Sequence, residues 1–149
     1  MGISQFITFN VFNNLIGIDI RDVREINRVL DVTPVQHAPD YVKGLINLRG
    51  NTVTVFDLGK RLGLGALTVS EESHNIILKK DAVGLLVDNI GDVIETNEVM
   101  IESPPANMGG VDGKFVDGVL KLDEDLLLIL SAENLLKYEP VQIEESKEK

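Results

Sequence analysis

The sequence is 149 residues long, is 44% hydrophobic and carries a net charge of −10 from 24 acidic and 14 basic side chains. This length and apolar fraction fit one compact domain, or two very small barrels that share a core, and they argue against disorder. The acidic balance argues against nucleic acid as a partner, because nucleic-acid binders use cationic side chains to neutralise phosphates. Binding to an anionic membrane surface is disfavoured for the same reason.

The chain contains no cysteine, which excludes disulfide bonds, zinc–thiolate sites and thiol nucleophiles. Residues 1–5 lack the basic and apolar regions of a signal peptide. No apolar stretch reaches the ~18 residues that a membrane-spanning helix needs. We therefore expect a soluble, cytoplasmic protein that does not insert into the membrane.

Short apolar segments separated by Gly, Asn or Asp follow one another along the chain, a pattern typical of a small all-β barrel or sandwich. In chain order, the first half predicts strands over 5–12 and 15–18, an extended stretch over 26–34, and a hairpin of 45–48 and 53–56. Asp57 then has the position and residue type of an N-cap, which predicts a short helix that runs to Leu62 and is closed by Gly63.

The same order of elements recurs in the second half of the chain. The aligned segments are 9–26 with 76–93, at a shift of 67 residues, and 41–48 with 115–122, at a shift of 74. The second shift also places Ser131 at the position of Asp57, so Ser131 is predicted to cap a second short helix. Two such units predict a duplicated barrel whose halves share a core, since neither half is large enough to be stable alone. The segment 95–113 is expected to form the longest loop.

Side chains that could carry catalysis are few and scattered. The two histidines, His37 and His74, lie far apart in the sequence at predicted loop or strand edges. The acidic clusters at 71–72 and 123–125 lack the spacing of a calcium loop, and no glycine run has the pattern of a phosphate-binding loop. We therefore predict no catalytic residue, no metal site and no cofactor, and a protein that is not an enzyme.

The two halves differ most at the tip of their last hairpin. The tip is Arg49-Gly50-Asn51 in the first half and Asp123-Glu124-Asp125 in the second. One interpretation is that solvated tips vary freely. The functional interpretation is that a guanidinium group on a rigid hairpin gives a directional donor for a partner's carboxylate or carbonyl group.

Residues 42–50 (VKGLINLRG) and 53–58 (VTVFDL) resemble the CheW-type chemotaxis coupling family. The pattern of that family is approximately V-x-G-hydrophobic-x-N-L-R-G, followed by P-hydrophobic-hydrophobic-D-L. Segments 17–26 and 84–93 add to the similarity, which spans about residues 5–137. Thr54 stands where the family pattern has proline, and we expect its free backbone N–H to be harmless in a hairpin.

The resemblance implies an all-β fold of two intertwined SH3-like five-stranded β-barrels, with short helices and a shared hydrophobic core. It implies a single CheW-like domain over residues 1–138. Within it, the first barrel is expected at 13–65 and the second is expected from 1–12 plus 70–138. Residues 139–149 are expected to form a polar, frayed tail.

The resemblance also implies a non-catalytic scaffold that couples chemoreceptors to a histidine kinase. The implied partners are the regulatory domain of a CheA-type kinase and the cytoplasmic tip of a methyl-accepting chemoreceptor, in arrays at the inner face of the membrane. The resemblance implies that the receptor-facing positions lie in the groove between the barrels, and those carried over by motif are Arg49, Glu25, Val23, Gly44, Val93 and Ile76. Arg49 would be a polar anchor that Glu25 accompanies, and Gly44 would permit close backbone approach. Val23 and Val93 are either apolar partner contacts or barrel core.

Two other functions stay open at this point. One is a CheW-like adaptor of another two-component pathway, such as motility, pili or development. The other is a small-ligand or nucleic-acid-binding barrel of the SH3 or OB type. Such a barrel needs exposed aromatic side chains and positive charge, and the acidic chain has five Phe, two Tyr and no Trp.

Overall fold

The computed structural model describes residues 2–28 and 31–137 and confirms the all-β prediction. The strands are β1 (Ile3–Val11), β2 (Asn14–Asp19), β3 (Val23–Arg28), β4 (Val42–Leu48), β5 (Asn51–Asp57), β6 (His74–Leu78), β7 (Val83–Val87), β8 (Asn89–Asn97), β9 (Val116–Lys121) and β10 (Leu126–Leu130). The short helices are α1 (Leu58–Arg61) and α2 (Ala132–Leu136), with single 3-10 turns η1 (Ile20–Asp22), η2 (Glu98–Met100) and η3 (Gly113–Phe115). None of the helices in these described ranges could span a lipid bilayer.

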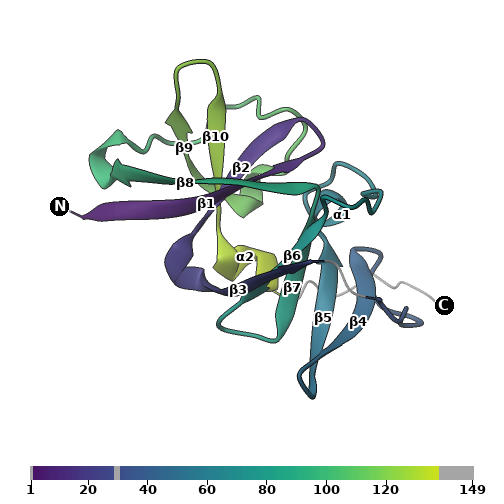
Figure 1. Cartoon of the computed structure of the whole chain (residues 1–149). Coiled ribbons are helices and arrows are strands. Elements are labelled where there is room, and N and C mark those ends of the chain that lie inside the picture. The colour runs from purple at the N-terminus through teal and green to yellow at the C-terminus, as the bar shows by residue number, and fades with distance from the viewer. Residues whose placement is uncertain (1, 29–30, 138–149) are drawn as a thin grey trace.

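The strands form two five-stranded sheets, each curled into a small barrel (Figure 1). The first barrel has the strand order β3-β6-β7-β5-β4, and the second has the order β8-β1-β2-β10-β9. Helix α2 lies between the two barrels (Figure 1). Each barrel therefore combines strands from both halves of the sequence, as the resemblance implies.

The division of the chain between the barrels differs from the predicted one. We predicted a first barrel at 13–65 and a second from 1–12 plus 70–138. Instead β2 stays with β1 in the second barrel, while β6 and β7 belong to the first. The reason is the tight turn between β1 and β2, where Val11 pairs with Asn14, because a hairpin closed this tightly cannot contribute its strands to two sheets. The two halves thus exchange whole hairpins.

Equivalent backbone contacts confirm the internal duplication. Strand β5 runs parallel to β7, with Thr54 opposite Val83. Strand β10 runs parallel to β2, with Leu128 opposite Ile16, and these are the residues that the shifts of 74 and 67 align with Thr54 and Val83. The N–H of Asp57 donates to the carbonyl of Tyr41 (2.7 Å), and the N–H of Ser131 donates to the carbonyl of Phe115 (2.9 Å). The parallel contacts join one repeat to the other, which makes the barrels intertwined.

The predicted helix caps are also confirmed. The Asp57 carboxylate accepts from the N–H of Lys60 at 3.1 Å, and the Ser131 hydroxyl accepts from the N–H of Asn134 at 3.1 Å. Helix α1 ends at Arg61, one residue before the predicted end, and Gly63 follows with a φ of 85°. Strand β8 extends to Asn97, so the predicted loop 95–113 begins later than expected.

One hydrophobic core joins the two barrels, as predicted. Its fully buried side chains include Phe9 and Ile16 from the second barrel, and Val55 and Leu85 from the first. A smaller cluster fills the second barrel alone and consists of Phe6, Leu120, Leu127 and Ile129. Because the main core is continuous across both barrels, burial of apolar surface holds them together.

Candidate partner-binding site

Arg49 lies at the tip of the β4–β5 hairpin in a left-handed backbone conformation. Leu48 pairs with Asn51, so Arg49 and Gly50 alone form the loop, and their φ angles are 52° and 87°. These angles fit a type I′ turn, for which Asn-Gly is the usual sequence. A left-handed conformation costs a residue with a Cβ about 1–2 kcal/mol. Folding of the hairpin therefore does not explain why an arginine stands here.

Asn47, also in the hairpin, holds this turn from one side. Its side-chain oxygen accepts a hydrogen bond from the N–H of Gly50 at 2.9 Å. This is a local side-chain-to-backbone contact of the kind that makes Asn frequent at turns. The family motif N-L-R-G thus contains both the exposed cation and the residue that fixes the turn carrying it.

The structure brings two of the predicted site residues, Arg49 and Glu25, into direct contact. The Nη2 group of Arg49 donates to the Oε2 atom of Glu25, which projects from β3. The side chain of Arg49 is 67% exposed and that of Glu25 is 23% exposed. An ion pair this accessible to water stabilises a fold by only about 0–1 kcal/mol. Its larger effect is to orient a guanidinium group that keeps further N–H donors directed to solvent.

Gly44 permits a close backbone approach, but the approaching atoms belong to the same chain. A Cβ on Gly44 would lie 2.2 Å from the carbonyl oxygen of Thr33, and the φ of Gly44 is +155°. Thr33 and Leu45 exchange two backbone hydrogen bonds, both 2.8 Å long. The glycine is buried beneath this contact. Its role in the fold is therefore explained without a partner.

Val23, Ile76 and Val93 divide into core and surface. Val23 is 8% exposed and Ile76 is 0% exposed, and both belong to the shared core. Because the side chain of Ile76 is fully buried in this core, a partner has no access to it. Val93 is 50% exposed and lies on β8, opposite Ile7 of β1. It is thus available as an apolar contact on the second barrel.

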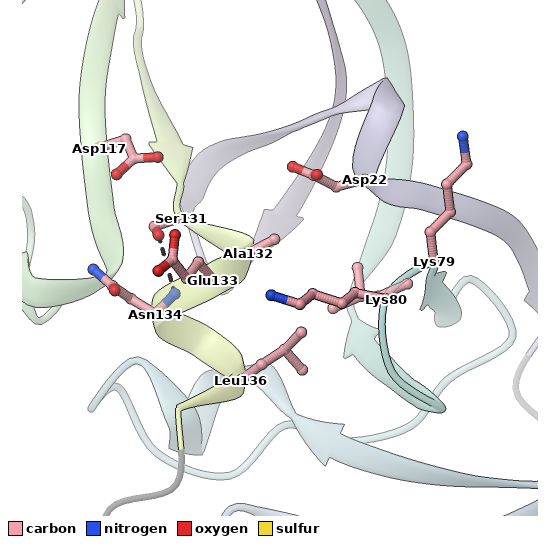
Figure 2. A pocket seen from close by; sticks show the side chains of 10 residues that line it. Asp22, Lys79, Lys80, Asp117, Ser131, Ala132, Glu133, Asn134 and Leu136 are labelled. Carbon is pink, nitrogen blue, oxygen red and sulfur yellow. Dashed lines mark hydrogen bonds between the residues drawn. The ribbon is translucent and has the colours of Figure 1, made fainter.

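The resemblance implies a groove between the two barrels, and the structure has a cleft there whose lining includes none of the six residues carried over by motif. The cleft has a volume of about 520 Å³ and is lined by residues of η1, the β6–β7 loop, β9 and α2. Figure 2 shows the side chain of Lys80 extended towards α2, with the carboxylates of Asp22, Asp117 and Glu133 around the cleft. Burial raises the pKa of the Asp22 carboxyl above its usual value, and the nearby carboxylates of Asp19 and Asp117 raise that pKa further. The lining residues come from segments far apart in the chain, so no local sequence pattern indicates them.

The site residues offer binding surfaces rather than reactive groups. Among residues 2–28 and 31–137, no group of three or more His, Cys, Asp or Glu side chains could hold a metal ion. His37 is exposed in a loop, and the Nδ1 of His74 lies 2.8 Å from the carbonyl oxygen of Glu72. An oriented, exposed arginine on the hairpin of a duplicated barrel is suited to binding another protein.

The comparisons with known proteins identify the family. The CheW-like domain matches residues 5–139. Over 144 residues the chain is 31% identical to the chemotaxis protein CheW of Treponema pallidum (strain Nichols), covering 93% of this chain and 85% of that protein. It is 32% identical over 140 residues to the chemotaxis protein CheW of Bacillus subtilis (strain 168), covering 93% of this chain and 90% of that protein.

A solved structure shows the same fold. The crystal structure of scaffolding protein TtCheW from Thermoanaerobacter tengcongensis matches with a TM-score of 0.83 and 33% sequence identity, over 93% of this chain and 90% of that one. The chain belongs to the CheW-like family of non-catalytic chemotaxis adaptors. The predictions of this family, and of a protein that is not an enzyme, are therefore confirmed.

Proposed function

We propose that this protein couples chemoreceptors to a histidine kinase in bacterial chemotaxis. It binds the cytoplasmic tip of a methyl-accepting chemoreceptor and the regulatory domain of a CheA-type kinase, in the cytoplasm and at receptor arrays on the inner face of the membrane. Membership of the CheW-like family supports this proposal. The observation that carries it is Arg49, an exposed cation that Glu25 orients and that the hairpin holds in a conformation unfavourable for arginine.

Each site residue has a role in this proposal that follows from its burial. Arg49 donates to a carboxylate or carbonyl of the receptor tip, and Glu25 sets its direction before binding. Val93 supplies apolar contact from the second barrel. Val23, Gly44 and Ile76 act from inside the fold, by shaping the strands on which the exposed residues stand.

Binding experiments with the purified full-length chain test the function. We expect it to bind the isolated kinase regulatory domain and a soluble fragment of the receptor tip, as measured by titration calorimetry. The absence of binding to both at high micromolar concentration would defeat the proposal. If the chain bound the kinase domain but not the receptor tip, it would instead belong to another two-component pathway.

Substitution of Arg49 tests the site. We expect Arg49→Ala and Arg49→Glu to weaken receptor-dependent kinase control while the protein stays folded. Arg21→Ala is a matched control, because Arg21 is 75% exposed and likewise pairs with a neighbouring carboxylate, that of Asp19. Unfolding of the Arg49 variants would show that Arg49 is structural, and an equal effect of Arg21→Ala would show that the loss is not specific to Arg49.

A further inference from the structure

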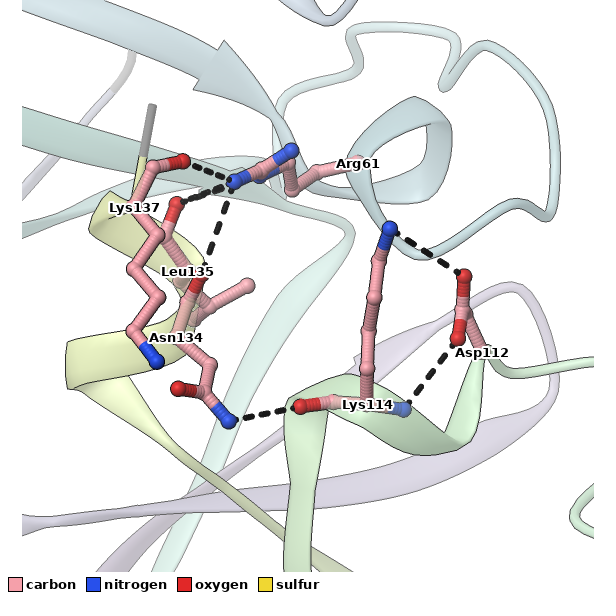
Figure 3. Close-up of polar contacts among 6 residues, drawn as sticks. All are labelled: Arg61, Asp112, Lys114, Asn134, Leu135 and Lys137. Carbon is pink, nitrogen blue, oxygen red and sulfur yellow. Dashed lines mark hydrogen bonds and ion pairs between the residues drawn. The ribbon is translucent and has the colours of Figure 1, made fainter. Parts of the chain in front are cut away.

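Arg61 is a buried cation at the junction between the two barrels. It ends helix α1, which follows β5 of the first barrel, and its exposed fraction is 5%. Its guanidinium group donates to the carbonyl of Leu135, from Nε at 3.1 Å and from Nη2 at 2.8 Å, and to the carbonyl of Lys137 at 2.9 Å (Figure 3). A buried charge is unfavourable unless such hydrogen bonds compensate for its lost hydration.

The carbonyls that Arg61 contacts lie at the end of helix α2, which follows β10 of the second barrel. The last carbonyls of a helix have no partner within the helix, and a cation at this end also interacts favourably with the peptide dipoles. The end of α2 is thus completed by a side chain that comes from the other barrel.

Two aromatic rings, one from each half of the chain, lie beside the same guanidinium group. The Cζ atom of Arg61 is 4.2 Å from the ring centroid of Tyr41 and 4.7 Å from that of Phe115. Tyr41 immediately precedes β4 in the first barrel, and Phe115 immediately precedes β9 in the second. The two rings occupy equivalent positions in the internal repeat. The cation therefore contacts both barrels through matching elements.

Only the first repeat carries this arginine. The position equivalent to Arg61 in the second repeat is Leu135, whose side chain is fully buried in the shared core. Apolar burial is non-directional and tolerates small rotations of one barrel against the other. A planar guanidinium group with several donors is directional and selects one arrangement.

We propose that Arg61 is a positioning residue that fixes the orientation of the two barrels. It thereby sets the first barrel's Arg49–Glu25 pair relative to Val93 on the second barrel. The inference rests on the proposed function, because the receptor tip is the partner that contacts both barrels. A partner that touches both barrels binds more tightly when their orientation is already set.

The distance between the barrels tests the proposal directly. The chain has no cysteine, so two introduced cysteines would be its only sites for spin labels. Asp81→Cys lies in the β6–β7 loop and Glu124→Cys in the β9–β10 loop, and the distance between their labels is measured by pulsed electron paramagnetic resonance. Both positions are exposed and lie on different barrels. We expect a narrow distance distribution in the labelled parent and a broader or shifted one with Arg61→Met. Receptor-tip affinity should fall about three- to thirtyfold with Arg61→Met.

Two further variants make the test specific. Arg61→Lys keeps a cation near the rings but loses the planar set of donors, so we expect intermediate distances and affinity. Lys60→Met is the matched control, because Lys60 is the neighbouring exposed cation on α1 and pairs at the surface with Asp40. Lys60→Met should change neither the distance distribution nor the receptor-tip affinity. If Arg61→Met does not fold, Arg61→Lys decides by the same two measurements.

The outcomes separate this proposal from the proposed function. Distances unchanged in the Arg61 variants would overturn it, and so would altered distances with unchanged receptor-tip affinity. Failure of the parent protein to bind the receptor tip would defeat the proposed function. The distance distributions would then still decide whether Arg61 fixes the barrels.

Discussion

The guanidinium group of Arg49 donates to the carboxylate of Glu25, and this contact joins the two edges of the first barrel. Arg49 follows β4 and Glu25 lies in β3, and these are the outermost strands in the order β3-β6-β7-β5-β4. The pair is too exposed to contribute much to stability. It does hold a long, flexible side chain in one direction before a partner arrives, which lowers the entropy cost of binding.

Arg49→Asn separates the turn from the cation that it carries. Asn tolerates a positive φ, and Asn-Gly is the preferred sequence of a type I′ turn. We expect the free energy of unfolding to stay the same or rise by up to about 1 kcal/mol. Receptor-tip binding should weaken by about tenfold or more, because a charge-assisted donor is lost. Urea unfolding and titration calorimetry measure the two effects.

Charge reversal provides the comparison for this variant. Arg49→Glu places a second carboxylate beside Glu25 and keeps a long side chain in the turn, so it should lower both binding and stability. If Arg49→Asn binds the receptor tip as the parent protein does, the arginine is not part of the interface.

Gly44→Ala should damage the fold rather than a contact surface. Its Cβ would lie 2.2 Å from the backbone of Thr33, which cannot move without breaking its hydrogen bonds to Leu45. We expect the free energy of unfolding to fall by about 3–5 kcal/mol, in the range of severe single substitutions. Chemical denaturation measures this loss.

Gly50→Ala is the matched control for Gly44→Ala. Gly50 also has a positive φ, +87°, but a Cβ there would meet nothing within 4 Å. Only the backbone strain of about 1–2 kcal/mol should remain. Equal losses for the two variants would contradict the steric explanation at Gly44.

Patterns within a single strand or turn made much of this fold predictable. The helix caps at Asp57 and Ser131 follow from residue type and position, and the shifts of 67 and 74 residues predicted the duplication. The same patterns predict the tight β1–β2 turn, but the assignment of each hairpin to a barrel was not predictable from them. It depends on parallel pairing between the repeats, such as that of Thr54 with Val83. Parallel strands are not joined by a tight turn, so no turn residues in the sequence indicate that they pair. The N–H of Thr54, expected to be free, in fact donates to the carbonyl of Ala82.

The candidate site was predicted as a set of residues but not as an arrangement. Arg49 was singled out because the repeat differs there, and its pairing with Glu25 joins strands that are distant in the chain. The burial of Ile76 depends on a core that is assembled from residues of both barrels. The contacts of Arg61 are with backbone carbonyls, which every residue carries, so no residue pattern could have marked them.

Two carboxylates near the cleft should give opposite responses to pH. The pKa of Asp22 is raised, chiefly by burial, so its ionised form is less favourable in the folded chain than in the unfolded chain. Asp22→Asn should therefore raise the free energy of unfolding at neutral pH. This advantage should disappear as the pH falls below the usual carboxyl range near about 4, where Asp22 is itself protonated.

Asp19→Asn is the comparison of opposite sign. The pKa of Asp19 is lowered, chiefly by its side-chain hydrogen bonds with Arg21, so its ionised form stabilises the folded chain above the unfolded pKa. The substitution keeps a side-chain oxygen to cap η1 but loses the ion pair, so it should lower stability at neutral pH. The loss should vanish as the pH falls through the folded pKa. Urea unfolding from about pH 7 to about pH 3 measures both variants, and shifts of the same sign would contradict this account.

Asn75→Leu should stabilise the protein. Asn75 lies in β6 with an exposed fraction of 0%, and neither polar atom of its side chain has a hydrogen-bond partner within the part of the chain that the structure describes. Asn27 faces it from β3, with its own buried amide nitrogen likewise unpaired there. A buried amide without a partner costs about 1–3 kcal/mol. Leucine has the same branching and number of side-chain heavy atoms, so we expect the free energy of unfolding to rise by about that amount in urea.

Two further variants make this prediction specific. Asn75→Asp places a charge in the same apolar surroundings and should destabilise the fold by several kcal/mol, roughly as other unpaired buried ions do. Asn51→Leu changes an exposed asparagine at the start of β5 and should alter stability by less than about 0.5 kcal/mol. A loss of stability in Asn75→Leu would mean that the amide has a partner that balances its burial. It would also mean that the pair of asparagines between β3 and β6 stabilises the first barrel.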